Sequence, residues 1–521
     1  MPVLLCILFW WFRMPVFGQE APDPSQEPTA PEQGTDREAA ARPPGEDTGP
    51  QPAGETPADI FYIIQAIRFD ITGRTRPLAL LDAGEFEQGE VIQGEAGLER
   101  YIKDKTQLLR NQRVLDAVTI DYATGAPDAQ GVVPVDLLIS VTDTWNIIVL
   151  PRPQYDSNNG FDITLKGRDY NFLGTMNALR IDLGYQHDEH DKNRAVFQID
   201  SDTPFHAFGY TWNFNFDHDF SYTLEDPIEE SLYYKNTTGI SMQLPYQWTT
   251  VTFGFEEALV FHEENDDEYK PEYGNYDDWY MSSELYTSWK IPIGIAVHTF
   301  GELAYTPKVA GVVKYPDAAL EYFRKGPTLT LSHSLGFGRI DWLGNYRSGL
   351  EASLENAYAY NFHTQSWDKT ISLSVASHTP LWDFFGISGR FRYRHWFDDA
   401  HDAGDALRGI LDKSVHVNYM VSLNLDFPFR LLRFTPSQWL GNRKFRLFNF
   451  ELHASPFIDA ALVSDPPVLL TGGLELIVFP EFMRSFYVRA SIGWNILELV
   501  KTGSLPTGEN REIFVGIGHH Y

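Results

Sequence analysis

Two short clusters in the sequence have side-chain types that bind metal ions. They are His187-Asp188-Glu189-His190-Asp191 and the acidic run from His262 to Glu268. Oxygen-rich clusters bind Ca²⁺ when their ligands recur at an ordered spacing. Neither cluster has such a spacing, so we expect solvated loops and no metal site. The sequence also lacks a nucleophile–base set, a phosphate loop and a nucleotide fingerprint. We therefore expect no catalytic residue, no cofactor and no enzyme.

The composition favours a chain that crosses a membrane with strands. Of the 521 residues, 14% are aromatic, yet the mean hydropathy is only −0.29. Beyond the first dozen residues, no apolar run reaches the length of about 20 that a spanning helix needs. Alternating strands with aromatic girdles produce this combination. A net charge of −30 disfavours nucleic acid as a partner, because phosphate binding needs a basic surface.

The first 58 residues divide into two predicted segments. Leu4 to Phe12 is a short apolar run, and a cut near Gln19 makes residues 1–18 a signal peptide. No Lys or Arg precedes the run, so the true start and the cleavage site stay open. Residues 19–58 are rich in Pro, Glu, Gly and Ala, which predicts a disordered acidic linker. The only cysteine, Cys6, lies in the first segment, so the mature chain has no disulfide.

Residues 59–143 predict one small α+β domain. The expected order is strand, two helices and two strands: Phe61–Thr72, Leu78–Glu85, Gly97–Arg113, Val118–Tyr122 and Val135–Val141. The second helix has an apolar face at helical spacing. The last two strands are separated by a Gly- and Pro-containing turn, as in a hairpin.

Residues 144–521 predict an antiparallel transmembrane β-barrel. In Tyr210–Asp217 every odd-numbered residue is polar and the others are aromatic, and Leu179–Tyr185 alternates in the same way. A lipid-facing outside and a water-facing lumen require this division. Arg390, Arg392 and Arg394 alternate with aromatic residues, so they should line the lumen. Tight turns interleave with longer polar loops, as expected for periplasmic turns and outside loops.

Four motifs occur in order along the predicted barrel. They are Asn171-x-x-Gly174 after the second strand, Leu407-Arg408-Gly409-Ile410 in a long loop, Phe457-Ile458-Asp459-Ala460-Ala461, and the closing segment Ile513 to Tyr521. Together with the α+β domain they resemble the BamA/TamA-type superfamily of outer-membrane assembly and translocation proteins, whose POTRA domain has the strand–helix–helix–strand–strand order. Ile410 replaces the usual aromatic residue, and Ala461 replaces the usual glycine.

The resemblance implies a contact between a loop and the barrel wall. In the family, the loop arginine enters the lumen and meets the wall carboxylate, so we expect Arg408 and Gly409 against Asp459. An arginine–carboxylate contact is bidentate and charge-assisted. It would hold a flexible loop inside the barrel. Without the flanking motifs, both residues would be read as ordinary polar groups.

The number of strands is open between 16 and 18. Five strands follow the Arg408 loop, as the family pattern of sixteen requires, whereas thirteen candidates precede it. The surplus pair is Trp279–Lys290 with Gly294–Pro307. It is either a hairpin inserted in an outside loop or an enlargement of the barrel.

The first and last barrel strands should form a seam. The first, Trp145–Tyr155, contains Pro151 and Pro153, and the last contains Gly516, Gly518 and Tyr521. Each proline removes a ladder donor, so this seam should be weak. A seam that parts would offer a strand edge to an incoming chain, which is β-augmentation. Alternatively, both prolines face away from the ladder or belong to a hinge below the membrane.

The resemblance implies an outer-membrane insertase with its POTRA domain in the periplasm. Its expected partners are unfolded outer-membrane clients, periplasmic chaperones or accessory lipoproteins, and outer-membrane lipid. A dedicated translocator, either TamA-like or for two-partner secretion, is an alternative. A passive porin or surface antigen is another. The single POTRA domain, where the general assembly factor has several, puts a housekeeping role in doubt.

Overall fold

The computed structural model describes residues 60–156, 160–187, 193–223, 232–261, 279–297, 301–316, 320, 325–398, 400–411, 414–464 and 467–517. The predicted signal peptide and linker lie outside these residues. So do all of the second acidic cluster, most of the first, and the closing residues Gly518 and Tyr521.

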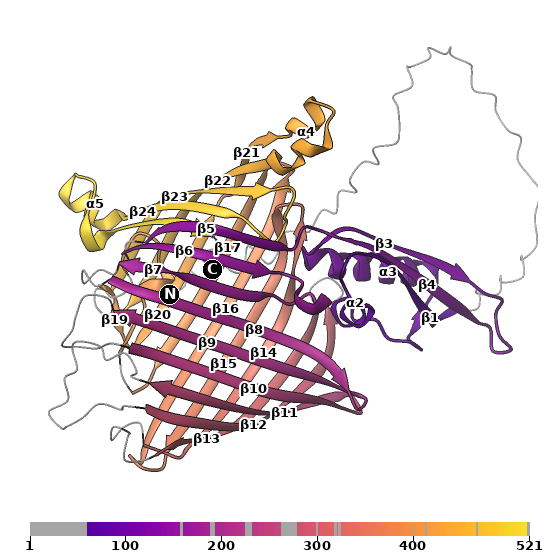
Figure 1. Cartoon of the computed structure of the whole chain (residues 1–521), viewed down its shortest axis with the longest axis horizontal. Coiled ribbons are helices and arrows are strands. Elements are labelled where there is room, and N and C mark those ends of the chain that lie inside the picture. Colours follow the sequence, from indigo (N-terminus) through magenta and orange to yellow (C-terminus); the bar gives the residue numbers. More distant parts are fainter. Residues whose placement is uncertain are drawn as a thin grey trace, which may run out of the picture. The chain divides into compact units, whose positions relative to one another are not determined.

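The N-terminal α+β domain occupies residues 61–143 (Figure 1, indigo). Its elements are β1 (Phe61–Thr72), α2 (Pro77–Gly84), β2 (Val91–Gln93), α3 (Glu95–Asn111), β3 (Leu115–Thr124) and β4 (Val132–Asp143). The sheet order is β2-β1-β4-β3, with β1 parallel to β4. The helices pack on the sheet through a core that includes Ile64, Leu80 and Leu109, all fully buried. The five expected elements are present, and the short strand β2 is an addition.

The remaining strands form one closed antiparallel barrel (Figure 1). They are β5 (Ile147–Asp156), β6 (Gly160–Asp169), β7 (Leu179–His187), β8 (Asn193–Ala207), β9 (Tyr210–Thr223), β10 (Leu232–Tyr246), β11 (Thr249–Phe261), β12 (Trp279–Val297), β13 (Gly301–Tyr315), β14 (Thr328–Leu343), β15 (Tyr346–Asn361), β16 (Ser366–Trp382), β17 (Phe385–Trp396), β20 (Tyr419–Asp426), β21 (Phe429–Phe434), β22 (Phe450–Val463), β23 (Val468–Pro480), β24 (Val488–Asn495) and β25 (Arg511–Ile517).

Short elements lie in the connections between these strands. They are η1 (Phe172–Gly174), β18 (His401–Asp402), η4 (Gly404–Ala406), β19 (His416–Val417), α4 (Pro436–Trp439), η6 (Arg443–Phe448), α5 (Ile496–Thr502) and η7 (Gly508–Asn510). In the described part of the chain, no helix is both long enough and apolar enough to cross a membrane.

The described barrel has eighteen strand positions, because β20 and β21 are two parts of one strand. Both lie between β17 and β22, and they keep the same register on β22, with Asp426 opposite Phe457 and Phe429 opposite Ala454. The break falls at Phe427-Pro428, where the proline has no N–H to donate. Of the two expected numbers, eighteen is therefore confirmed. The surplus pair is the wall strands β12 and β13, and the alternative of an outside hairpin was wrong.

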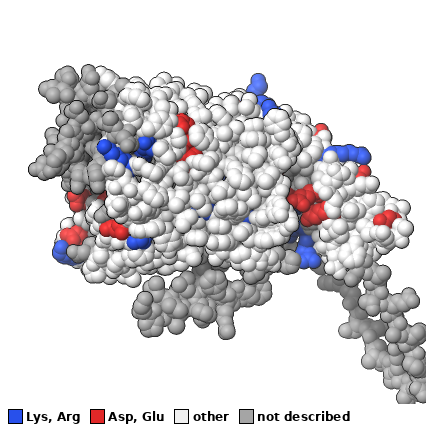
Figure 2. All heavy atoms as spheres, turned by 90° about the horizontal axis from the view of Figure 1, so that it is seen from below, with Lys and Arg blue, Asp and Glu red and all other residues white. Residues whose placement is uncertain are grey.

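The barrel wall divides its faces as the alternation requires. Outward-pointing residues such as Leu183, Phe253 and Leu285 are exposed and apolar. Inward-pointing residues such as Asn424 and Asp459 are polar and fully buried. On the side seen in Figure 2, charged side chains are sparse over the middle of the wall and gather toward its ends. This outward apolar band is the surface that a lipid bilayer covers.

Candidate functional site

The loop that joins β17 to β20, residues 397–418, packs against the inner face of the wall. We call it the lumen loop. Its residues Ala403, Leu407 and Ile410 are buried together with Met420 of β20 and Ala461 of β22. Asn424 of β20 donates a hydrogen bond of 2.8 Å to the carbonyl of Ala406. An apolar cluster with a buried polar contact therefore fixes the loop before its charged residues are considered.

Arg408 joins the lumen loop to two carboxylates of the wall. Its Nε and Nη2 donate to the two oxygens of Asp459 at 2.9 and 2.7 Å, and its backbone N–H donates to the same group at 3.0 Å. Its Nη1 donates to Asp426 at 2.6 Å. The guanidinium also lies 3.8 Å from the ring centroid of Phe457. Arg408 is 3% exposed and Asp459 is fully buried, so this is a desolvated ion pair with several hydrogen bonds.

Gly409 brings the lumen loop against the last two strands. Its φ of +99° favours glycine, and a Cβ atom there would lie 2.5 Å from the backbone nitrogen of Trp494 in β24. Its N–H donates to the carboxylate of Glu512 in β25 at 2.8 Å. Leu411 donates from its backbone to the carbonyl of Glu509 at 3.1 Å. The loop is thus attached to the closing strand as well as to β20 and β22.

The sequence reasoning located Arg408, Gly409 and Asp459 and missed Asp426 and Glu512. The structure brings the first three together as expected. Asp426 ends the alternating run of β20, and Glu512 shares the inward face of β25 with Phe514. The alternation of polar and apolar residues indicates an inward position for both residues. Several acids face the lumen, however, and the alternation does not tell which one the loop reaches.

The seam between β25 and β5 is paired at only two positions in the described residues. Phe514 lies opposite Asp156, and Val515 lies opposite Tyr155. On its other side, β25 pairs with β24 from Arg511 to Ile517. Within the described residues, β25 is therefore paired along its length with β24 and at two positions near its middle with β5.

Pro151 and Pro153 lie in β5, the strand that faces β25 across the seam. The ladder between β5 and β6 runs without a break from Ile147 to Asp156 through both prolines. A proline nitrogen that faced β6 would interrupt that ladder, since it has no hydrogen to donate. Both missing donors therefore belong to the edge that faces β25. This geometry places both prolines at the edge of β5 that the seam uses. Gly516 is close to this edge, because a Cβ there would lie 2.8 Å from the guanidinium of Arg152.

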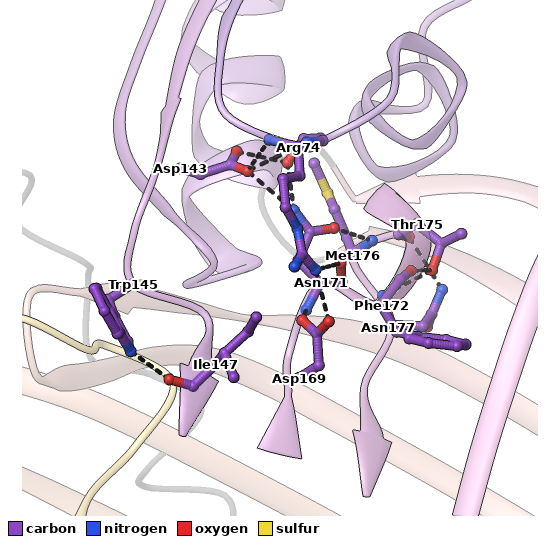
Figure 3. A network of polar contacts seen from close by, with 11 residues as sticks. Arg74, Asp143, Trp145, Ile147, Asp169, Asn171, Phe172, Thr175, Met176 and Asn177 are labelled. Carbon is purple, nitrogen blue, oxygen red and sulfur yellow. Dashed lines mark hydrogen bonds and ion pairs between the residues drawn. The ribbon is translucent and has the colours of Figure 1, made fainter. Parts of the chain in front are cut away.

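The turn between β6 and β7 attaches the barrel to the α+β domain (Figure 3). Asn171 is fully buried, and its Nδ2 donates to Thr75 at 2.7 Å and to Asp143 at 3.2 Å. Gly174 has a φ of +76°, and a Cβ atom there would lie 2.2 Å from the carbonyl oxygen of Arg74. The two residues of the expected turn motif thus position the domain.

A second set of contacts attaches the α+β domain to the barrel end beside β14. Arg113 is buried, donates to the carbonyls of Arg484 and Gly344 at 2.5 and 3.2 Å, and stacks on the ring of Trp342 at 4.1 Å. Burial and the neighbouring Arg484 lower the pKa of Arg113 to about 10. Because Trp342 belongs to β14 and Asn171 follows β6, the α+β domain contacts the barrel end at two well-separated places.

The three lumen arginines of β17 lie on the inner face. Arg390 is opposite Asn424 and Arg392 is opposite Ser422, both buried inward-facing residues of β20. Arg394 reaches Asp405 of the lumen loop at 3.2 Å in a half-exposed ion pair. In the described residues, no group of three or more His, Cys, Asp or Glu side chains is arranged to hold a metal ion.

Comparisons with known proteins returned matches among solved structures. CdiB from Acinetobacter baumannii matches with 14% identity and a TM-score of 0.47, covering 88% of this chain and 74% of that one. BamA from Haemophilus ducreyi, in a form lacking POTRA domains 1–3, matches with 13% identity and a TM-score of 0.35, covering 88% and 84%. CdiB from Escherichia coli matches with 10% identity and a TM-score of 0.38, covering 90% and 92%. No family model and no curated protein matched.

In fold, the chain is a closed antiparallel transmembrane β-barrel that carries a small α+β domain at one end. Its own wall supplies the argument, with eighteen antiparallel positions, a lipid-facing apolar band and an inward-facing lumen loop.

Proposed function

We propose that this protein inserts or translocates other proteins across the outer membrane by opening the seam between β25 and β5. The observation that carries the proposal is the difference in strand pairing between the two edges of β25. One edge is fully paired with β24 and is joined to the lumen loop through Glu512. Within the described residues, the ladder toward β5 consists of Val515 and Phe514. An incoming strand would replace β5 on this edge of β25 by β-augmentation.

The α+β domain would serve as the receiving module of this machine. Its element order is that of a POTRA domain, with β2 added, and its attachments to Asn171 and Arg113 would hold it beside the barrel opening. We propose that it lies in the periplasm and that its partners are unfolded outer-membrane proteins, delivered by chaperones or accessory lipoproteins. We propose no chemical fuel for this scheme, because the folding of the client barrel in the bilayer would supply the driving free energy.

A disulfide across the seam tests the proposal. Tyr155 and Val515 face each other and point outward, so the pair Tyr155→Cys and Val515→Cys, in a Cys6→Ser background, should form a bridge. We expect the oxidised barrel to lose insertion of a client barrel into proteoliposomes and to regain it after reduction. The matched control is Ala490→Cys with Val515→Cys, which bridges β24 and β25 and should remain active. Full activity with the seam locked would overturn the gate.

Depletion distinguishes the general role from the narrower ones. We expect loss of several outer-membrane barrels if the protein is an insertase. Loss of one secreted protein alone would instead indicate a dedicated translocator. A change restricted to small-solute uptake would indicate a passive pore and would contradict the proposal.

A further inference from the structure

The connection between β21 and β22, residues 435–449, departs from the short turns expected on this side of the barrel. It contains α4 and η6, and its Arg446 makes two hydrogen bonds, of 2.9 and 3.0 Å, to Asp116 of the α+β domain. It therefore lies at the domain end of the barrel (Figure 1, α4). We call it the rim segment.

The rim segment is held in one conformation by a buried asparagine. Asn449 donates to Ser437 at 2.6 Å and to Glu481 at 2.8 Å, and its side-chain oxygen accepts from the backbone of Ser437 at 3.1 Å. Asn449 is only 1% exposed. These hydrogen bonds fix the backbone of the rim segment, so its remaining side chains have defined directions.

Those other side chains are large and apolar, and they are exposed. Trp439, Leu440, Leu447 and Phe448 are each 60% exposed or more. Exposed apolar groups at this density mark a surface that something covers. On a β-barrel, the candidates are a protein partner and the bilayer itself.

The surface is continuous with the lipid-facing wall, and this selects the bilayer. The ring of Trp439 lies 5.0 Å from that of Phe434, which in turn lies 5.3 Å from that of Phe450. Phe434 and Phe450 are cross-strand partners on the outer face of β21 and β22, in register with the outward Leu432 and Leu452. Because lipid already covers that wall, the lipid-covered surface extends onto the rim segment without a gap. Tryptophan at such a boundary is typical of the membrane interface.

The charge of the rim segment favours contact with anionic lipid headgroups. Residues 435–449 contain three basic residues and no acidic residue, in a chain whose net charge is −30. Lys444 is exposed, and Arg433 at the adjoining strand end is 59% exposed. Basic residues beside an interfacial apolar face attract anionic lipid headgroups.

We infer that the rim segment is an interfacial anchor that inserts into the adjacent leaflet and binds anionic phospholipid there. Its opposite side carries the Arg446–Asp116 contact, so the anchor also fixes the α+β domain with respect to the membrane plane. This inference requires only that the barrel spans a bilayer, and it is independent of the seam.

Site-directed fluorescence tests the anchor in the full-length protein. In the Cys6→Ser background, Leu440→Cys and Leu447→Cys carry an environment-sensitive dye, and Gln130→Cys, in an exposed turn of the α+β domain, is the matched control. In vesicles containing phosphatidylglycerol and phosphatidylcholine, we expect blue-shifted emission at the first two positions. We also expect quenching there by lipids that carry a nitroxide near the headgroup, and protection from aqueous iodide. The control should show none of these. Heat-modifiable gel migration confirms that each variant is folded.

Two further arms decide what covers the segment. Vesicles of phosphatidylcholine alone, and the variant Lys444→Glu in the mixed vesicles, should each give several-fold weaker protection from iodide. Equal protection in all three cases would overturn the preference for anionic lipid. Iodide access at positions 440 and 447 equal to that at 130 would overturn the anchor. Protection that occurs in native membranes and is absent from lipid vesicles would also overturn it, because a protein would then be the cover.

Discussion

The two edges of β25 are supported very differently. Toward β24, the strand is paired from Arg511 to Ile517, and Glu512 receives the N–H of Gly409 from the lumen loop. Toward β5, the ladder within the described residues consists of Phe514 and Val515, and the prolines of β5 face this edge. A closed barrel normally satisfies every strand edge. This difference is the basis of the proposed gate, and the lumen loop is attached to β25 through Glu512.

The largest expected effect comes from reversing the charges that fix the lumen loop. Arg408→Glu and Asp459→Arg should each destabilise the folded barrel by about 3–5 kcal/mol, because each leaves a buried charge without its partner. The midpoint of urea unfolding, followed by gel migration, measures the loss. Combined, the two changes should restore part of it.

The rescue should be incomplete for a specific reason. Asp426 also contacts Arg408, so after the exchange it would face a carboxylate. Adding Asp426→Asn to the double variant should therefore recover more stability. Single variants that unfold like the wild type would contradict the conclusion that these charges fix the lumen loop.

Gly409→Ala should have the next largest effect. A methyl group would overlap the backbone of Trp494, and the positive φ adds strain, so we expect a loss of about 1–3 kcal/mol. Gly441→Ala is the matched control, since Gly441 has a φ of +61° with nothing within 4 Å of its Cβ position. The difference between the two unfolding midpoints isolates the close approach. Equal losses would mean that the contact with β24 contributes nothing.

Replacing the prolines should strengthen the weak edge by a smaller amount. Pro151→Val and Pro153→Val each return a ladder donor to β5, which is worth about 0.5–1.5 kcal/mol when bonded. We expect slower amide hydrogen exchange in β5 and β25 and slower client insertion. Pro292→Val, in β12 far from the seam, should leave both rates unchanged. Unaltered exchange in the seam variants would show that the prolines do not weaken it.

The smallest effect is expected from the other ion pair of the lumen loop. Arg394 and Asp405 are 34% and 49% exposed, so Arg394→Ala should cost less than about 1 kcal/mol. The same unfolding assay applies. A loss of stability as large as that of Arg408→Glu would mean that the exposed ion pair of the lumen loop contributes as much as the buried one.

The sequence predicted the parts of the site that local patterns encode. Alternation identifies the inward face of a strand, so the placement of Asp459 and of the arginines of β17 was readable. The loop path was not, because Asp426 and Glu512 are brought to Arg408 and Gly409 by chain folding across the lumen. Likewise, Val417 belongs to the short strand β19 and packs in the loop cluster because of contacts that the local sequence does not encode.

Other structural features could not be predicted from the sequence, because they are short or depend on contacts with other parts of the chain. The strand β2 has three residues, too few for a period to show, and it exists because it pairs with Phe61–Ile63. The break at Phe427-Pro428 reads as a strand end in sequence, yet β22 continues past it and keeps both halves in one register. The folded rim segment depends on Asn449, whose three hydrogen bonds no local pattern announces.

The barrel wall also differs in height around its circumference. Strand β12 has 19 residues, whereas β24, next to the closing strand, has 8. At a rise of about 3.4 Å per residue, β24 extends only about 27 Å even before its tilt is considered. Hydrophobic mismatch makes a bilayer thin beside a short wall. The membrane should therefore be thinnest and most easily deformed beside β24 and β25, so a chain leaving the barrel there would cross less hydrocarbon than anywhere else around it.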